Sequence, residues 1–233
     1  MTPAAPVAFE HHHGRLLYRR RDGGDVRGRE DWALTLNRDG SRTMRCLAIT
    51  DDSAFVRDVT YTIDHARQPV DAFVRVQVLG RVIGAGYFRT DGDTLRLTAD
   101  SPAAGRVEQV VPSAGPLHII THAVMLDGWT FWHYDTNGPA DQSLTCYNTS
   151  TRWNGTDGPV GRIEQLQVSL IGAEPVTVPA GTFECKHYVL SSDIVKSPPS
   201  HLYVTGDHNI LVRYDWEGLG LEYVLEHWTK GQP

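Results

Sequence analysis

The sequence predicts a mostly β fold: a strongly curved antiparallel sheet, a half-barrel or open barrel, with one short helix covering a central cavity. Three observations predict it. Apolar and polar residues alternate with a period of two through most of the chain, which is typical of half-buried strands. Glycine, asparagine and aspartate punctuate these stretches as turn residues do. No apolar stripe of helical spacing persists in residues 1–100.

The strands follow in order along the chain. The early period-two stretches are 14–20, 30–38, 43–50, 56–64, 72–80, 82–90 and 94–99. Asp39-Gly40 and Asp91-Gly92 stand between such runs, and Asp-Gly in that position is a strong hairpin signal. We expect a long antiparallel meander, with Gly84 and Gly86 marking a bulge or bend. Strands resume at 161–179, 182–195, 199–216 and 221–230.

The middle of the chain has a different pattern. Pro116 suits a first helical position, eleven residues without a helix breaker follow, and Gly128 suits a C-cap. We predict a helix over 116–127, apolar on nearly all sides and therefore buried or covering a cavity. The stretch WTFWHYD at 129–135 alternates again and predicts a strand.

Length and composition limit the possible functions. The chain has 233 residues, 40% of them hydrophobic, which fits one domain spanning 1–233. Its net charge of −6 argues against nucleic acid as a partner. No apolar run is long enough to span a membrane, so we expect no membrane partner.

The cysteines and the N-terminus indicate a compartment. Cys46, Cys146 and Cys185 are odd in number and lack metal-binding spacing, which predicts free thiols in a reducing compartment. Cys185 and His187 lie two apart on one strand face, the one arrangement that could form a thiol nucleophile. The first residues lack a secretory signal pattern. We therefore expect a cytoplasmic protein, and a homodimer is compatible with the sequence.

The last third of the chain contains a recognisable motif. Residues 175–190 read PVTVPAGTFECKHYVL and are followed by the hairpin HLYVTGDHNILVRYDW. The element VPAGTF, with Gly181 suited to a tight turn and Phe183 directed to the core, resembles a family of uncharacterised bacterial β-rich domains. Those domains are similar to the outer-membrane lipoprotein carriers. The resemblance implies a half-barrel around helices and an apolar cavity, and allows a lipid-carrier role.

Histidines supply the candidate catalytic groups. His118 and His122 are spaced i, i+4, so on a helix both rings would share one face. That spacing could bind zinc, but the glutamate of a metalloprotease motif is missing, and we predict no metal site. His133 and Tyr134 follow among aromatic residues. Because histidine titrates near neutrality, we predict that His118, His122 and His133 act as acid or base, with Tyr134 as a hydrogen-bond donor.

Other strands carry the candidate ligand-binding residues. Aromatic rings suit an apolar or aromatic ligand, tyrosine hydroxyls suit an oxyanion, and arginines suit a carboxylate or phenolate. The predicted substrate-binding residues are Tyr61, Arg75, Trp132, Tyr203 and Arg213. The alternative for each residue is a structural or solvated role.

The motifs leave three functions open. The first is an enzyme that needs no cofactor and performs a lyase or isomerase step by acid–base chemistry on a small aromatic or apolar molecule. We find no P-loop, no dinucleotide-binding glycine motif and no nucleophile elbow. The second is a non-catalytic carrier of lipids or hydrophobic metabolites. The third is a structural or assembly module.

Overall fold

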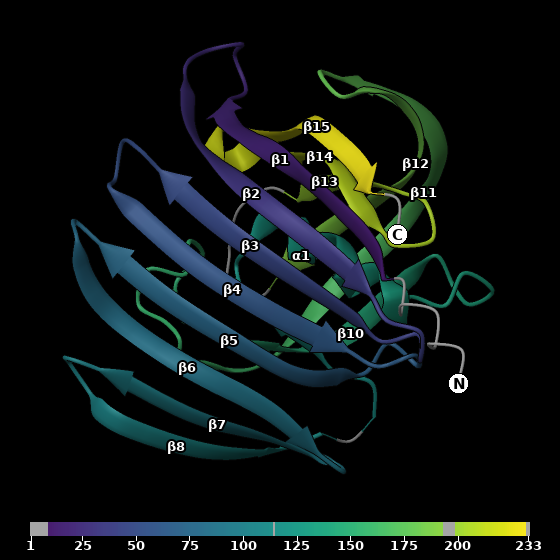
Figure 1. Ribbon diagram of the computed structural model, residues 1–233. Coiled ribbons are helices and arrows are strands. Elements are labelled where there is room, and N and C mark those ends of the chain that lie inside the picture. The colour runs from purple at the N-terminus through teal and green to yellow at the C-terminus, as the bar shows by residue number, and fades with distance from the viewer. Residues whose placement is uncertain (1–8, 114, 193–198, 232–233) are drawn as a thin grey trace, which may run out of the picture.

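The computed structural model describes residues 9–113, 115–192 and 199–231, and fifteen strands in this part of the chain form one sheet (Figure 1). The first eight strands are β1 (Glu10–Arg20), β2 (Val26–Leu36), β3 (Arg42–Thr50), β4 (Phe55–Ile63), β5 (Pro69–Val78), β6 (Arg81–Asp91), β7 (Thr94–Ser101) and β8 (Gly105–Pro112). The remaining strands are β9 (His118–Ile120), β10 (Asp141–Asn148), β11 (Arg162–Val178), β12 (Gly181–Ser192), β13 (Ser200–Thr205), β14 (Ile210–Trp216) and β15 (Leu221–Gly231).

The sheet is open, and neighbouring strands are consecutive in the chain except where the first strand, β1, pairs with the last, β15. Its strand order is β8-β7-β6-β5-β4-β3-β2-β1-β15-β14-β13-β12-β11-β10-β9, so β1 pairs with β15 and the two edges are β8 and β9. Neighbours are antiparallel except β9 and β10, which run parallel. The predicted mostly β fold with a curved antiparallel sheet is confirmed.

The β9 end of the sheet curls inward against the strands of the first half. The Tyr61 hydroxyl on β4 accepts the Ile119 N–H at 3.3 Å. The Phe88 and Tyr147 rings lie 5.7 Å apart. The Tyr147 hydroxyl donates to Gln109 on β8 at 2.6 Å. A side-chain contact therefore links the two ends of the open sheet.

The hairpin signals are confirmed. Gly40 and Gly92 adopt positive φ in the β2–β3 and β6–β7 turns. The bend expected at Gly84 and Gly86 is a register shift between β5 and β6. These glycines also make room, because a Cβ at either position would lie 2.7 Å from Pro159 in the loop that crosses the inner face.

The prediction of a helix over 116–127 is wrong in its extent, and the strand predicted at 129–135 is not formed. Residues 118–120 form β9, and helix α1 spans only Val124–Asp127 before the 3-10 helix η1 (Gly128–His133). A second 3-10 turn, η2, spans Glu217–Leu219. This segment crosses the interior of the molecule. Its conformation is therefore decided by the sheet edge and the core that it contacts, and not by the periodicity of its own sequence.

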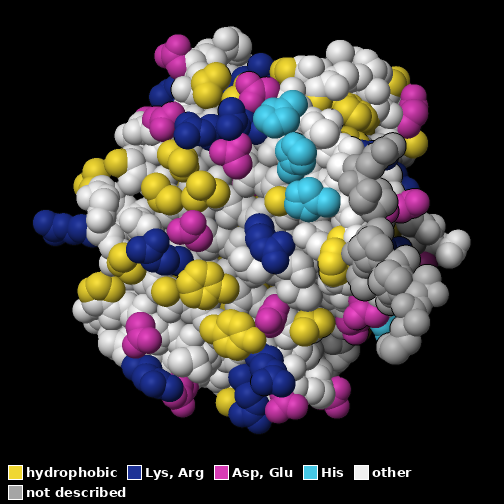
Figure 2. Space-filling view, viewed as in Figure 1, with side chains coloured by type: hydrophobic (Ala, Val, Ile, Leu, Met, Phe, Trp, Pro, Cys, Tyr) yellow, Lys and Arg dark blue, Asp and Glu magenta, His cyan; other side chains and the backbone are white. Residues whose placement is uncertain are grey.

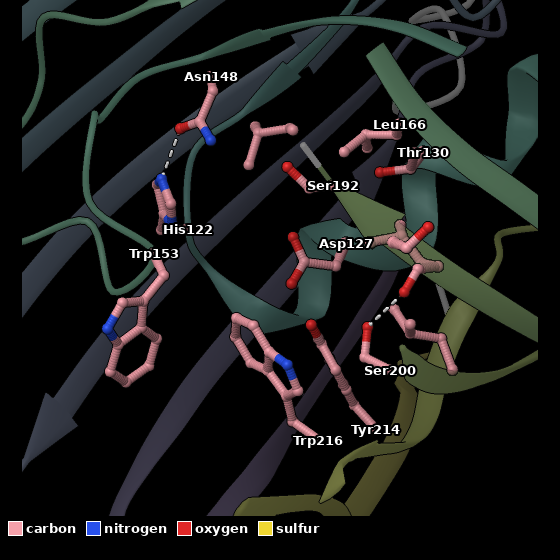
Figure 3. A pocket seen from close by; sticks show the side chains of 14 residues that line it. His122, Asp127, Thr130, Asn148, Trp153, Leu166, Ser192, Ser200, Tyr214 and Trp216 are labelled. Atoms are coloured by element: carbon pink, nitrogen blue, oxygen red, sulfur yellow. Dashed lines mark hydrogen bonds between the residues drawn. The ribbon is translucent and has the colours of Figure 1, made fainter. Parts of the chain in front are cut away.

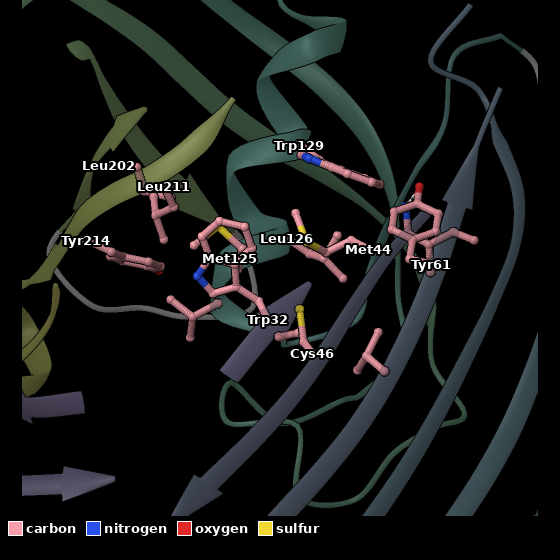
Figure 4. Close-up of a cluster of buried hydrophobic side chains, with 14 of the residues drawn as sticks. Trp32, Met44, Cys46, Tyr61, Met125, Leu126, Trp129, Leu202, Leu211 and Tyr214 are labelled. Carbon is pink, nitrogen blue, oxygen red and sulfur yellow. Dashed lines mark hydrogen bonds between the residues drawn. The ribbon is translucent and has the colours of Figure 1, made fainter. Parts of the chain in front are cut away.

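Helix α1 and η1 pack inside the curved sheet. Met125, Leu126 and Trp129 meet inner-face residues of β2, β3, β4, β13 and β14 (Figure 4). The carboxyl group of Glu30 on β2 accepts the N–H groups of Val124 and Met125, both at 2.8 Å, and the Tyr18 hydroxyl at 2.5 Å. A buried side chain of the sheet therefore satisfies backbone donors at the start of this short helix.

The outer face carries charged side chains together with exposed hydrophobic ones, among them Leu47, Phe73 and Tyr87. Figure 2 shows basic and acidic side chains interspersed over it, including the ion pairs Arg15–Asp31 at 2.6 Å and Arg75–Asp58 at 3.5 Å. Within the described residues, no helix is long and apolar enough to cross a membrane.

Candidate ligand-binding and acid–base site

Two adjoining hollows lie against α1 and the loop 149–161, one lined by residues of η1 and β9–β14 and the other by residues of β1–β4, β14 and β15. Their volumes, mouths included, are about 690 and 990 Å³. Five residues line both hollows and form their common wall: His122, Asp127, Trp153, Tyr214 and Trp216 (Figure 3). We treat them as one cavity with two compartments.

The compartments differ in chemistry. The smaller, which we call the leucine compartment, is lined by Ile120, Leu166, Leu190 and Leu202, with Thr130, Ser192 and Ser200 as polar groups. The larger, the arginine compartment, is lined by Arg19, Arg27, Arg57 and Phe55 together with Thr50, Ser53 and Tyr223. Apolar walls with a few placed polar groups are the usual composition of a small-molecule site.

Asp127 is the acidic group of this cavity. It ends α1 and projects between His122 and Tyr214 (Figure 3). The residue is partly buried, and its carboxyl group makes no hydrogen bond or ion pair with the described part of the chain, so it is free to contact a molecule in the cavity. Burial, and then the nearby Glu30 carboxyl, raise the pKa of Asp127 well above its usual value. A raised pKa favours the protonated form of this carboxyl group, which can donate a hydrogen bond to a ligand.

His122 is fixed in the wall rather than free. Its backbone adopts φ 60°, an uncommon conformation for a residue with a side chain. Its Nε2 lies 2.7 Å from Asn148 Oδ1, which also accepts the Ser150 N–H. The ring therefore donates through Nε2. Burial, and then the charge of Arg57, lower the pKa of His122 to about 3, so the ring is neutral.

Arg57 is the buried cation of the arginine compartment. Its side chain is 4% exposed and donates to two backbone carbonyls, of His122 and of Asn154. Burial lowers the pKa of Arg57 to about 10, so it stays charged at neutral pH. Among the described residues, no carboxylate oxygen lies within 4.0 Å of the Arg57 guanidinium, which is the distance limit for an ion pair.

The loop carrying Asn154 can approach Arg57 closely because Gly155 has no side chain. Gly155 has φ +67°, and a Cβ there would lie 2.3 Å from Arg57 Nη2 and 2.8 Å from His122 Cγ. The loop, the arginine and the histidine therefore form one packed unit.

The three predicted acid–base histidines do not meet in this cavity. His122 lines it, whereas His118 and His133 line neither compartment. His118 lies on β9 with its ring 5.7 Å from Tyr61, and burial lowers its pKa to about 3. Burial, and then Arg67, lower the pKa of His133. The shared helical face expected of His118 and His122 is absent, because a strand end and a turn separate them.

Tyr134, Tyr61 and Trp132 also lie outside the cavity lining. The Tyr134 hydroxyl donates to the Ala140 carbonyl at 2.7 Å. Tyr61 is fully buried in the core. Trp132 lies between the guanidinium groups of Arg42 and Arg67, 5.4 and 5.5 Å from its ring.

Arg75, Tyr203 and Arg213 lie on the outer face. Tyr203 and Arg213 alternate with Leu202 and Tyr214, which line the cavity, so their side chains point the other way. Tyr203 stacks on His187 with centroids 4.3 Å apart. Arg213 pairs with Asp215 at 2.9 Å and Glu222 at 3.0 Å. The substrate-binding roles predicted for these residues stay predictions. None of the three side chains lines the cavity.

Asp127 and Arg57 are the groups that sequence reasoning missed. Asp127 is the one charged residue in the apolar run AVMLDGWTFW at 123–132, and an acid in that position is a signal of burial. Arg57 shares the buried face of β4 with Val59 and Tyr61, from which it is spaced by two and four residues. This period of two was the signal that could have placed it on the inner face.

One group of described residues has the composition of a metal site: Glu10, His12 and His208. Its hydrogen bonds argue against that use. The Trp228 indole N–H donates to His12 Nδ1 at 3.2 Å, so the proton of this ring is on Nε2, which lies 2.7 Å from Glu10. A metal at Nε2 would need that proton moved to Nδ1, against the indole donor. These residues do not fit a metal.

The cysteines are free and buried, as predicted. Burial raises the pKa of Cys185 to about 12, so its thiol is not a nucleophile near neutrality.

Comparison with known proteins supports the fold. No family model and no curated protein matches the chain. A β-barrel-like protein of the domain of unknown function DUF1849 from Brucella abortus has a similar structure, with a TM-score of 0.56 at 9% identity, over 97% of this chain and 98% of that one. A DUF1089 family protein from Pseudomonas aeruginosa gives a TM-score of 0.47 at 12% identity, over 82% and 90% of the two chains. The likeness to the DUF1849 protein shows that the chain shares its fold with a β-barrel-like domain of unknown function.

Proposed function

We propose that the protein binds a small, mainly apolar molecule in the cavity and transfers a proton to it from Asp127. The observation that carries this proposal is the Asp127 carboxyl group, which has no described partner, a raised pKa and a place in a wall of aromatic rings. A carboxylic acid kept neutral by its surroundings can donate a proton or a hydrogen bond to developing charge. A perturbed acid in a hollow is the usual mark of a functional site.

The reaction class that fits is a lyase or isomerase step on an aromatic or otherwise apolar compound. Asp127 would protonate an oxygen or carbon of the ligand and, as the carboxylate so formed, would take a proton back from a neighbouring atom, which restores the acid. Tyr214 lies in the same wall, and its hydroxyl would orient that atom. His122 would keep the loop in place through Asn148 rather than act as base, because its pKa of about 3 makes it weakly basic.

Turnover of a panel of phenolic alcohols, aryl ketones and aliphatic alcohols tests the proposal. Asp127→Asn keeps the shape and removes the acid, and we expect kcat/KM to fall by about 100-fold or more. Asp58→Asn, which removes an outer-face carboxyl paired with Arg75, is the control and should keep wild-type activity. Equal turnover by Asp127→Asn and wild type would exclude Asp127 as the acid.

A carrier without catalysis is the second candidate. The leucine compartment and the weakly basic His122 favour it, because together they offer burial without a base. A carrier would bind members of the panel, observed as a change in the fluorescence of Trp153 and Trp216, and return them unchanged. The likeness to lipoprotein carriers belongs to the carrier proposal, which the same binding experiment tests, and a cytoplasmic location stays a prediction.

A further inference from the structure

The chemistry of the ligand follows from an imbalance of charge in the arginine compartment. Three arginines line it. Arg19 pairs with Glu222 and Arg27 with Asp52, at 2.7 and 2.6 Å. Arg57 is more buried than either and has only carbonyl oxygens as acceptors. A buried cation without an anion at contact distance costs free energy that a bound anion would recover.

The carboxyl groups near Arg57 do not supply this anion. Glu30 lies close enough to influence Arg57, but its oxygens already accept the Tyr18 hydroxyl and two backbone N–H groups of α1. Asp127 also influences Arg57, but its carboxyl oxygens lie beyond the 4.0 Å of an ion pair with the guanidinium, and burial raises its pKa, which favours the uncharged form. The guanidinium therefore faces the cavity with room for an anionic group of a ligand.

The leucine compartment on the other side of the common wall accepts a different part of a molecule. Its walls are mainly aliphatic, and apart from the common wall its polar groups are uncharged hydroxyls and the amide of Asn148. A ligand that spans the two compartments crosses Asp127, Trp153, Tyr214 and Trp216, which line both. Such a molecule has an apolar body, an acidic end and a middle that lies beside the proton donor.

We propose that the ligand is an amphipathic anion, with a carboxylate-sized group against Arg57 and an aromatic or aliphatic body in the leucine compartment. This inference rests on the proposed function, because it concerns the same cavity. It adds the charge and the orientation of the ligand, which place Asp127 near the middle of the molecule rather than at its acidic end.

Three probes of one shape test the inference: 4-phenylbutanoate, 4-phenylbutanamide and 4-phenylbutylamine. Their affinities for the full chain are measured by calorimetry and tryptophan fluorescence at neutral pH. We expect the carboxylate to bind at least about tenfold more tightly than the amide, as is usual for a charge-assisted contact, and the amine to bind most weakly. Arg57→Gln should remove the preference for the carboxylate, whereas Arg96→Gln, at an exposed arginine paired with Asp91 on the outside of the molecule, should keep it.

The outcomes separate the two proposals. If none of the probes nor any member of the earlier panel binds, the proposed function fails. If the amide binds as well as the carboxylate, or the amine binds best, the cavity is a ligand site but the anion inference is wrong. The comparison in the wild-type chain decides this even if Arg57→Gln does not fold.

Discussion

Asp127 couples the stability of the fold to pH. Its pKa is raised in the folded state, so the folded protein holds this proton more tightly than the unfolded chain does. The stability that the protonated group contributes is complete below the unfolded pKa of about 3.9 and is lost as the pH rises toward the folded pKa. Asparagine has no such proton. We expect the unfolding free energy of wild type relative to Asp127→Asn to fall with rising pH, by up to about 1.4 kcal/mol per pH unit. Urea unfolding at about pH 5 and pH 7 measures this, and a constant difference would contradict the raised pKa.

A substitution at Gly155 tests the packing of the loop 149–161 against the cavity wall. Gly155→Ala combines an unfavourable φ of +67° with a collision against Arg57 and His122, whereas Gly80→Ala has φ +72° and open space. Both variants pay the cost of left-handed backbone, about 1–2 kcal/mol. We expect Gly155→Ala to lose a further 1–3 kcal/mol or so through overpacking, and to weaken ligand binding. Equal unfolding free energies for the two variants would show that the loop can move away without cost.

At the level of elements, α1 is too short to be stable alone. A single turn forms one or two internal hydrogen bonds, and helices of this length are marginal without outside contacts. Glu30 provides such contacts by accepting the Val124 and Met125 N–H groups. We expect Glu30→Gln to lower the unfolding free energy by about 1–3 kcal/mol, because the amide turns one acceptor into a donor facing donors. Glu108→Gln on the exposed strand β8 is the control and should be nearly neutral.

The elements also show how far sequence reasoning reaches. Strands such as β4, whose positions alternate between buried and partly buried, follow from local pattern because one face is buried along the whole length. The interior segment at 117–134 does not. Its residues are apolar on all sides, so no period distinguishes helix from strand there. Pairing of His118–Ile120 with Cys146–Asn148 decides its first part, and this contact between distant residues leaves no local signal.

The candidate site was predictable only in part for a related reason. His122 was found because histidine suggests chemistry by its type. Asp127 and Arg57 were missed because their importance arises from where the curved sheet brings them. The strand alternation that placed Val59 and Tyr61 in the core also places Arg57 on the inner face. An inward arginine becomes a site only when a loop and a helix from elsewhere in the chain enclose it.

At the level of the whole molecule, one tyrosine links the two ends of the open sheet. The Tyr147 hydroxyl on β10 donates to Gln109 on β8 at 2.6 Å and accepts the Gly161 N–H at 3.0 Å. Strands β8 and β10 lie at opposite ends of the strand order, so this contact closes the molecule where backbone pairing does not. The curled shape, and with it the loop that covers the cavity, depends on such contacts.

Tyr147→Phe tests this closure because it removes the hydroxyl and keeps the buried ring. We expect a loss of about 1–3 kcal/mol in unfolding free energy, since the backbone N–H of Gly161 is left without its acceptor. Hydrogen exchange should accelerate in β9, β10 and the loop 149–161 together, because these segments would open as one unit. Tyr87→Phe is the matched control: its exposed hydroxyl donates to Asp71 at 3.2 Å on the outer face, and its loss should leave both measurements nearly unchanged. If exchange in Tyr147→Phe rises only at Gly161, the ends of the sheet are held by apolar packing instead, and the hydroxyl serves one loop residue alone.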